Sequence, residues 1–125
     1  MASTDPIIAV VDEESPVRVM LGRLLRLADY RVTAFATGEA FLASLATQRP
    51  ACVVLDIHMP GLSGFDVQAR LRAAQIPIPV VFITASDDPA LDRQAASLSA
   101  VRVLRKPFSS DELMAAINLA VLTKD

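Results

Sequence analysis

Short apolar runs alternate along the chain with longer stretches in which apolar residues recur at helical spacing. The run Ile7 to Val11 contains no polar residue, which is typical of a strand covered on both faces. Further runs predict four more strands, at 31–35, 51–55, 80–84 and 101–104. The intervening stretches predict five helices, at about 16–28, 39–47, 65–74, from close to 89, and at about 110–122. Strands and helices in strict alternation predict a parallel sheet with helices on both faces.

Polar residues mark where several of these helices should begin. Ser15 precedes Pro16, so Ser15 is expected as an N-cap residue with proline at the first helical position. Asp87 or Asp88 is expected to cap the helix that begins near 89. Ser109 with Glu112 three residues later is a capping-box pattern for the last helix.

Composition indicates one domain with an aliphatic core. The chain has 125 residues, is 53% hydrophobic and only 5% aromatic, and has a mean hydropathy of +0.43. No apolar stretch is long enough to cross a bilayer, and the start does not read as a signal peptide. The single cysteine, Cys52, lies in an apolar run and is expected to be buried. We therefore expect a reduced, soluble, cytoplasmic domain.

Charge argues against direct contact with nucleic acid. The formal net charge is −2, and no run of Lys and Arg could neutralise a row of phosphates. No direct nucleic-acid or membrane contact is therefore expected of this domain.

Chemically active side chains stand at the carboxyl ends of the predicted strands. Asp12 and Glu13 follow the first strand, Asp56 the third, Thr84 closes the fourth, and Lys106 follows the fifth. In an open parallel sheet, ligands bind outside this edge. We therefore expect these side chains to converge on one site.

Carboxylates that converge in this way need a counter-charge. Two of them about 4 Å apart repel by roughly 4 kcal/mol at an effective dielectric near 20. Oxygen ligands suit Mg²⁺ (or Mn²⁺), which often combines carboxylates, waters and a substrate phosphate. Lys106 can pair with Asp56 or with an incoming phosphoryl oxygen, and Thr84 can donate to that oxygen. These parts suit phosphoryl transfer to a carboxylate.

Four segments of the chain resemble the receiver domain of two-component response regulators: Val10–Glu13, Leu55–Gly61, Ile83–Ala85 and Lys106–Phe108. The resemblance implies a three-layer doubly wound fold of five βα units, with strand order 2-1-3-4-5. It also implies that residues 1–125 form a single receiver domain, with the first strand near 7–11 and a phosphoacceptor loop at 56–64.

The resemblance also implies roles for individual residues. Asp56 would be the phosphoacceptor, with Asp12, Glu13, Asp56 and the backbone carbonyl of His58 as the metal site. Thr84 and Lys106 would sense the phosphoryl group, Ser86 and Pro107 would lie at the rim, and the Lys106–Pro107 bond would be cis.

Three residues depart from the usual receiver pattern. Glu13 stands where aspartate is commoner, which can alter metal geometry slightly. Val103 replaces an aromatic residue of the switch, so transmission must use the backbone, the fourth helix or another route. Ser99 stands where glycine is frequent and could stiffen or reshape the turn before the fifth strand. Glu14, by contrast, is expected to be a solvated loop acid.

The leading interpretation is a signalling switch rather than an enzyme, with weak intrinsic phosphotransfer and autodephosphorylation. A sensor histidine kinase or phosphotransfer protein would donate the phosphoryl group. An output domain or target protein would respond, and a homodimer could form through the fourth helix, fifth strand and fifth helix.

Three other functions remain open from the residues. A phosphatase of the haloacid-dehalogenase type would need a second aspartate where His58 stands. A flavin-binding protein would need a Ser/Thr/Gly-rich phosphate loop where Asp12, Glu13 and Glu14 stand. A phosphorylation-independent interaction module is suggested by Val103 and Ser99.

Overall fold

The five apolar runs form one parallel sheet in a computed structural model that describes residues 5–123. Its strands are β1 (Ile7–Val11), β2 (Arg31–Phe35), β3 (Cys52–Asp56), β4 (Val80–Thr84) and β5 (Arg102–Arg105). They lie in the order β2-β1-β3-β4-β5, as the resemblance implied. No helix among residues 5–123 has the length and apolar character needed to cross a membrane.

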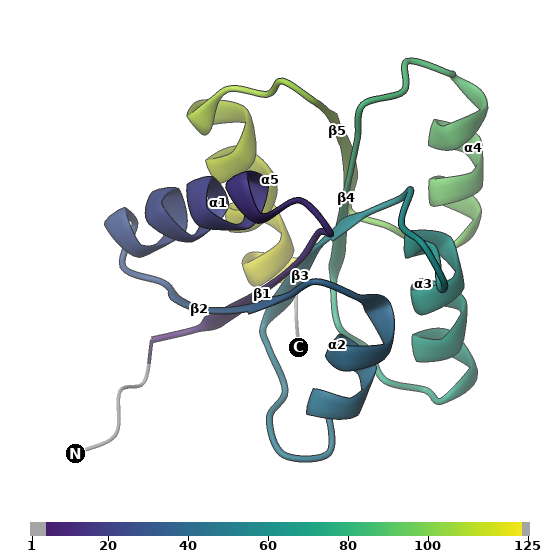
Figure 1. The fold of residues 1–125 in the computed structure, drawn as a ribbon, viewed down its shortest axis with the longest axis horizontal. Coiled ribbons are helices and arrows are strands. Elements are labelled where there is room, and N and C mark those ends of the chain that lie inside the picture. The colour runs from purple at the N-terminus through teal and green to yellow at the C-terminus, as the bar shows by residue number, and fades with distance from the viewer. Residues whose placement is uncertain (1–4, 124–125) are drawn as a thin grey trace.

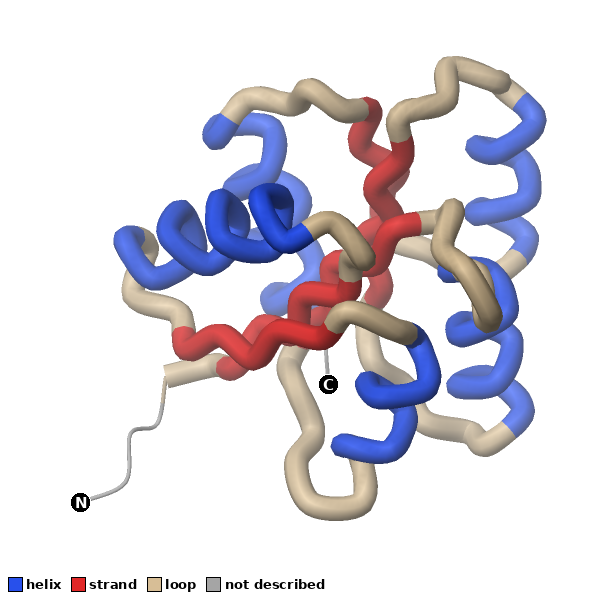
Figure 2. Tube along the Cα trace, viewed as in Figure 1, coloured by secondary structure: helices blue, strands red, loops and turns tan. Residues whose placement is uncertain are grey.

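Helices cover both faces of this sheet. They are α1 (Ser15–Leu27), α2 (Gly38–Ser44), α3 (Gly64–Ala73), α4 (Ala90–Ser97) and α5 (Ser110–Thr123). Helices α1 and α5 lie on one face, and α2, α3 and α4 lie on the other (Figure 1). The tube view shows the strands running through the middle, between the two helical layers (Figure 2).

Alternate strand residues divide the core into two halves. Ile8 and Val10 of β1 pack with α1 and α5, while Ala9 and Val11 pack with α2, α3 and α4. This division follows from the period-two geometry of a strand. Strands β3 and β4 are buried along their whole length, whereas the edge strands expose Arg31 and Arg102. Apolar runs without a polar interruption therefore mark the central strands, whereas the edge strands also contain exposed charged residues.

The helix starts match the sequence expectations in part. The Ser109–Glu112 capping box is present, with both reciprocal hydrogen bonds at 3.0 Å. The N-cap of α4 is Pro89 rather than Asp87 or Asp88, although Asp88 Oδ1 accepts a hydrogen bond from the backbone N–H of Ala90, the first residue of α4, at 2.9 Å. The expectation for Ser15 was wrong, because Ser15 is the first residue of α1 and Glu14 is its N-cap.

The structure contains a second capping box that the sequence analysis did not predict. Ser63 and Asp66 exchange the same pair of hydrogen bonds at the start of α3. At the other end of a helix, α2 stops at Ser44 rather than at Thr47. The backbone around Thr47 instead forms turns.

Two further residues bear on the sequence expectations. Cys52 is fully buried, as expected, and burial raises the pKa of its thiol to about 12. Ser99 adopts a φ of 61°, the left-handed conformation that glycine favours. Serine therefore keeps the glycine-like turn, and its hydroxyl accepts a 2.7 Å hydrogen bond from Arg72.

The start of α3 lies directly against the end of β3. A Cβ atom on Gly64 would stand 2.4 Å from the Asp56 carbonyl oxygen and 2.9 Å from the Ile57 Cα. Both obstacles are backbone atoms, so they cannot rotate away as a side chain could. The close approach places α3 at the carboxyl edge of the sheet and requires glycine at this position.

We expect Gly64→Ala to lower the free energy of unfolding by about 1–3 kcal/mol, the usual cost of overpacking. Urea unfolding followed by far-ultraviolet circular dichroism measures this directly. Gly22→Ala is the matched control, because the Cβ there would meet only the end of the flexible Arg26 side chain, at 2.9 Å. That variant should retain the parent midpoint or gain slightly from better helix propensity. Equal midpoints for Gly64→Ala and the parent would contradict this reading of the contact.

Candidate functional site

The sheet brings the predicted site residues to one edge. Strands β1 and β3 pair Val11 with Leu55, so the same register continued by one residue places Asp12 beside Asp56. Thr84, the last residue of β4, pairs with Arg105, and Lys106 follows immediately. Asp12 and Thr84 have no exposed surface, and Asp56 is 5% exposed. Both carboxylates are therefore held inside the protein.

The ammonium group of Lys106 forms ion pairs with both of these carboxylates. Lys106 Nζ lies 2.9 Å from Asp12 Oδ2 and 3.6 Å from Asp56 Oδ2. It also lies 3.3 Å from Glu14 Oε1. Burial lowers the pKa of Lys106, but its hydrogen bond to Asp12 and the nearby negative charges outweigh this effect and raise the pKa overall. Lys106 therefore stays charged.

The electrostatics of Asp56 favour a further positive charge at the site. Burial raises the pKa of Asp56, and the negative charge of Asp12 raises it more. Lys106 and the backbone N–H of His58, 3.3 Å from Asp56 Oδ1, act in the opposite direction but do not cancel the rise. The ionised form of Asp56 is thus under-compensated in this arrangement.

Asp12 and Asp56 fit a divalent cation of the Mg²⁺ type. Such an ion takes oxygen ligands, usually keeps several waters and needs only one or two protein carboxylates. Among residues 5–123, no group of three His, Cys, Asp or Glu side chains is placed to hold a metal. Asp12 and Asp56 nevertheless repel each other, and a divalent ion bound between their oxygens would reduce this repulsion.

The neighbours of Asp12 differ from the sequence expectation. Glu14 was expected to be a solvated loop acid, but its carboxylate pairs with Lys106, although 59% of the side chain is exposed. Glu13 is exposed. Arg18, which the sequence analysis did not single out, donates a 2.7 Å hydrogen bond to the Asp12 carbonyl. The sequence signal that could have identified Arg18 is its position one turn into the helix that follows Asp12.

His58 and Pro107 lie at the exposed margin of the site. The backbone of His58 faces Asp56 through its N–H, as described above. The peptide bond between Lys106 and Pro107 is cis, as the resemblance implied.

A chain of hydrogen bonds runs from Thr84 toward α4. Thr84 Oγ1 accepts from the Ser86 N–H at 3.1 Å, and Ser86 Oγ accepts from the Asp88 N–H at 3.2 Å. The Asp88 carbonyl accepts from Arg105 at 2.9 Å. Arg105 also makes a two-pronged ion pair with Asp92 of α4, at 2.8 and 3.1 Å. Ser86, expected at the rim, is thus the first link beyond Thr84.

Val103 occupies the place of the missing aromatic residue. It pairs with Phe82 in the sheet and is half-buried against the core on the α2–α4 side. Phe82 in turn packs edge-on against Phe65, with ring centroids 5.0 Å apart. Position 103 carries no aromatic side chain, and hydrogen bonds through Ser86 and Asp88 connect Thr84 with Arg105 and α4.

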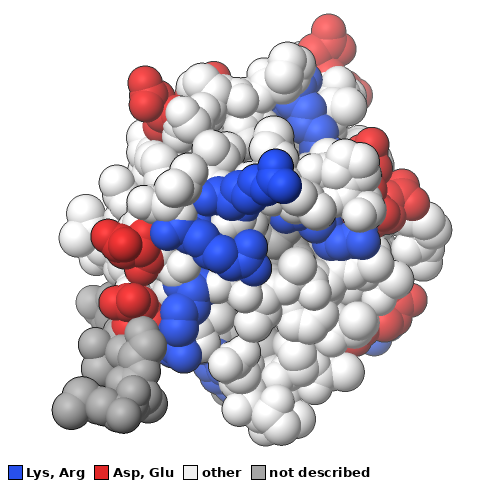
Figure 3. Space-filling model, turned by 60° about the vertical axis from the view of Figure 1, so that its left-hand side comes forward, with Lys and Arg blue, Asp and Glu red and all other residues white. Residues whose placement is uncertain are grey.

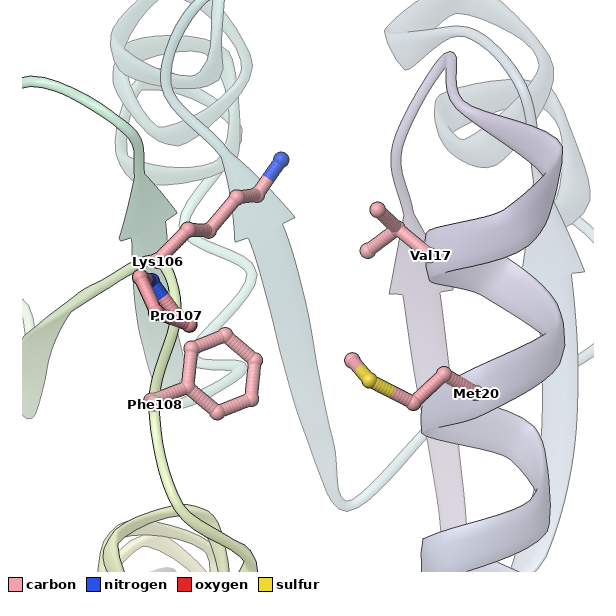
Figure 4. A pocket seen from close by; sticks show the side chains of 5 residues that line it. All are labelled: Val17, Met20, Lys106, Pro107 and Phe108. Atoms are coloured by element: carbon pink, nitrogen blue, oxygen red, sulfur yellow. The ribbon is translucent and has the colours of Figure 1, made fainter.

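An apolar groove of about 310 Å³ opens beside the site. Val17 and Met20 of α1 face Pro107 and Phe108 across it, and Lys106 extends along its upper edge (Figure 4). Lys106 therefore borders the groove and also contacts Asp56.

The adjoining side of the molecule is basic, although the net charge is negative. Figure 3 shows Lys and Arg side chains gathered across this side. Arg18, Arg23 and Arg26 of α1 line a shallow groove there. In the sequence these arginines form no continuous run, but helical spacing places them on the side of the first helix away from its apolar residues.

Comparison with known sequences is consistent with this geometry. The family model described as the response regulator receiver domain matches residues 8–118. The transcriptional regulatory protein FixJ of Bradyrhizobium diazoefficiens is 40% identical over 114 residues, which cover 91% of this chain and 56% of FixJ. The chain thus spans about half the length of the curated relatives it matches.

Solved structures agree in fold. The crystal structure of FixJ-N superposes with a TM-score of 0.90 at 31% identity and covers 98% of both chains. A structure described as the BeF3-activated DrrB receiver domain gives a TM-score of 0.85 at 25% identity, covering 95% of this chain and 99% of that receiver-domain chain. On this sequence and structural evidence, the chain belongs to the response regulator receiver domains of two-component signalling.

Proposed function

We propose that this receiver domain, residues 1–125, accepts a phosphoryl group on Asp56 from a sensor histidine kinase or a phosphotransfer protein. One observation carries the proposal: Asp56 is a buried strand-end carboxylate, beside Asp12 and 3.6 Å from the Lys106 ammonium. The acyl phosphate then alters the surface that a downstream domain or target contacts. Weak autodephosphorylation returns the switch to its resting state in the cytoplasm.

In the transfer step, a carboxylate oxygen of Asp56 attacks the phosphorus atom of the donor. A P–O bond forms, the P–N bond of phosphohistidine breaks, and the imidazole leaves with the electron pair. Lys106 stabilises the oxygens of the transferring group from its position beside Asp56. Thr84 accepts a hydrogen bond from Ser86 and keeps its own proton for a phosphoryl oxygen. The result is an aspartyl phosphate.

A divalent ion, Mg²⁺ or Mn²⁺, would be held by Asp12, Asp56, the His58 carbonyl and Glu13. When bound, it would neutralise the charge that develops on the phosphoryl oxygens. The raised pKa of Asp56 supports the Asp12–Asp56 pair of this set, because burial and the negative charge of Asp12 both disfavour the ionised form of Asp56.

Substitution of the acceptor tests the proposal. With acetyl phosphate and Mg²⁺, intact-protein mass spectrometry should show one added phosphoryl group on the parent and none on Asp56→Asn. Chelation of the divalent ion should abolish the gain in the parent. Asp111→Asn, which removes the same charge from the exposed first turn of α5, should react like the parent. Equal incorporation by the parent and Asp56→Asn would refute the assignment.

The apolar groove beside Lys106 supports docking of the protein that donates the phosphoryl group. Met20, which is 42% exposed, lies in this groove opposite Phe108. A helix that buries apolar residues there would present its phosphohistidine next to Lys106 and Asp56. Small donors such as acetyl phosphate need no such contact, so the two kinds of donor can be separated by mutation.

Met20→Gln should slow phosphotransfer from a phosphorylated histidine-phosphotransfer domain about fivefold or more, as expected for an interface anchor worth about 1–2 kcal/mol. Its rate with acetyl phosphate should stay at the parent value. Leu27→Gln is the matched control on the same helix, since Leu27 is 83% exposed and lies outside the groove. Comparable slowing with both donors would rule out a docking role, and both rates are measurable in one quenched-flow experiment.

The polar chain from Thr84 to α4 supports a route for the output. Movement of Thr84 toward a phosphoryl group would shift Ser86 and Asp88, which hold Arg105 through the Asp88 carbonyl. Arg105 would carry this shift to Asp92 on α4. The face formed by α4, β5 and α5 is then the surface offered to a target, to an output domain or to a second copy.

Arg105→Ala should therefore uncouple α4 from the acceptor site. Beryllofluoride with Mg²⁺ is expected to change hydrogen exchange in residues 86–98 of the parent and to leave it nearly unchanged in the variant. Binding of beryllofluoride itself should persist. Arg102→Ala removes an exposed arginine from the same strand and should behave like the parent. A full exchange response in Arg105→Ala would show that another route transmits the signal.

A phosphorylation-independent interaction module remains the second candidate, favoured by Val103 in place of the switch aromatic. It predicts the same partner affinity with and without beryllofluoride. The acceptor geometry described above favours the switch.

A further inference from the structure

Lys106 has one carboxylate partner that neither the strand pattern nor the acceptor chemistry requires. Its ammonium lies 2.9 Å from Asp12, 3.3 Å from Glu14 and 3.6 Å from Asp56. The contact with the acceptor is thus the longest of the three. In this arrangement Lys106 is held toward the side of the site from which α1 begins.

The backbone around Glu14 explains why its side chain can reach Lys106. The Glu14 N–H donates to Asp12 Oδ1 at 2.9 Å, which folds the chain back just after β1. Glu14 is the N-cap residue of α1, but its side chain makes no capping hydrogen bond. Arg18 fixes the same turn by donating to the Asp12 carbonyl. The Glu14 carboxylate is therefore free of the usual N-cap role and is positioned over the site.

The ion pair between Glu14 and Lys106 can break and re-form easily. Glu14 is 59% exposed, whereas the Lys106 side chain is only 17% exposed and Asp12 is fully buried. An ion pair with one exposed partner is weak and exchanges readily. Once Asp12 is engaged by a divalent ion, Glu14 is the remaining carboxylate that competes with Asp56 or its phosphoryl group for Lys106.

We propose that Glu14 is a positioning residue that holds Lys106 away from Asp56 and thereby restrains phosphoryl transfer. This inference rests on the proposed function of Asp56. Removal of the Glu14 charge lets Lys106 move toward the acceptor and the incoming phosphoryl oxygens. The same movement brings the ammonium closer to the pair of carboxylates that would bind the divalent ion. Glu14 therefore sets both the rate of acceptance and the affinity for the metal.

A double-mutant cycle tests this role. Glu14→Gln should accept phosphoryl from acetyl phosphate about two- to fivefold faster than the parent, the range expected for an exposed ion pair. Calorimetric titration should show Mg²⁺ binding weakened by a similar factor. In a Lys106→Ala background, Glu14→Gln should change neither quantity, because the group that Glu14 positions is gone.

The cycle separates positioning from a simple effect of charge. If the Glu14 carboxylate acted only by repelling the donor or attracting Mg²⁺, Glu14→Gln would have the same effect with and without Lys106. Equal effects in both backgrounds would overturn the proposal, as would parent-like values for Glu14→Gln beside Lys106. Asp111→Asn controls for the loss of one exposed charge and should leave the rate and the Mg²⁺ affinity unchanged.

The two levels of inference fail in different ways. Failure of the parent to gain a phosphoryl group would remove the proposed function itself. A parent that is modified on Asp56, with a Glu14→Gln variant that matches it, would remove only the role of Glu14. The Mg²⁺ titration requires no phosphoryl transfer, so it remains informative when Lys106→Ala reacts too slowly to follow.

Discussion

The structure depends on two carboxylates, Asp12 and Asp56, buried side by side with one ammonium group between them. A buried charge is unfavourable unless it is paired, and Lys106 supplies one positive charge for both acids. Burial and, after it, the negative charge of Asp12 raise the pKa of Asp56 despite the opposing effect of Lys106. The surrounding fold tolerates this excess of negative charge because fully buried strands and the close approach of Gly64 hold the backbone in place. Such an arrangement suits a site in which a bound cation balances the excess negative charge and a phosphoryl group alters it.

Rigid and adjustable parts are separated in this molecule. The acids belong to the carboxyl ends of β1 and β3, where the apolar core fixes their positions. Lys106 carries its charge on a flexible chain of four methylene groups and has three carboxylates within reach. Glu14 and Arg105 are partly exposed ion-pair partners. The charged groups can therefore rearrange without repacking the interior, which a switch requires.

Because strand side chains alternate between the two faces, Asp56 and Lys106 belong to one face of the sheet and Thr84 belongs to the other. Asp56 and Lys106 each lie two residues beyond a residue, Val54 or Leu104, that packs under α1 and α5. Thr84 lies two residues beyond Phe82, whose ring belongs to the core under α2, α3 and α4. The apolar groove beside Lys106 is lined by residues of α1 and of the segment before α5, whereas the polar chain from Thr84 leads to α4. Figure 1 shows that α1 and α5 cover one face of the sheet and α4 covers the other.

The sequence by itself determined the alternation of strands and helices, the central strands, and the residues that end them, because these depend on local periodicity and on the geometry of parallel sheets. It assigned a metal role to Glu13 and a solvated position to Glu14, but the structure pairs Glu14 with Lys106, because the direction of the turn after β1 decides where each of two consecutive acids points. It likewise assigned the N-cap of α1 to Ser15 rather than to Glu14. The pairing of Lys106 with Glu14 and of Arg105 with Asp92 was decided by the tertiary structure alone, because each pair joins separate elements whose approach no local pattern encodes.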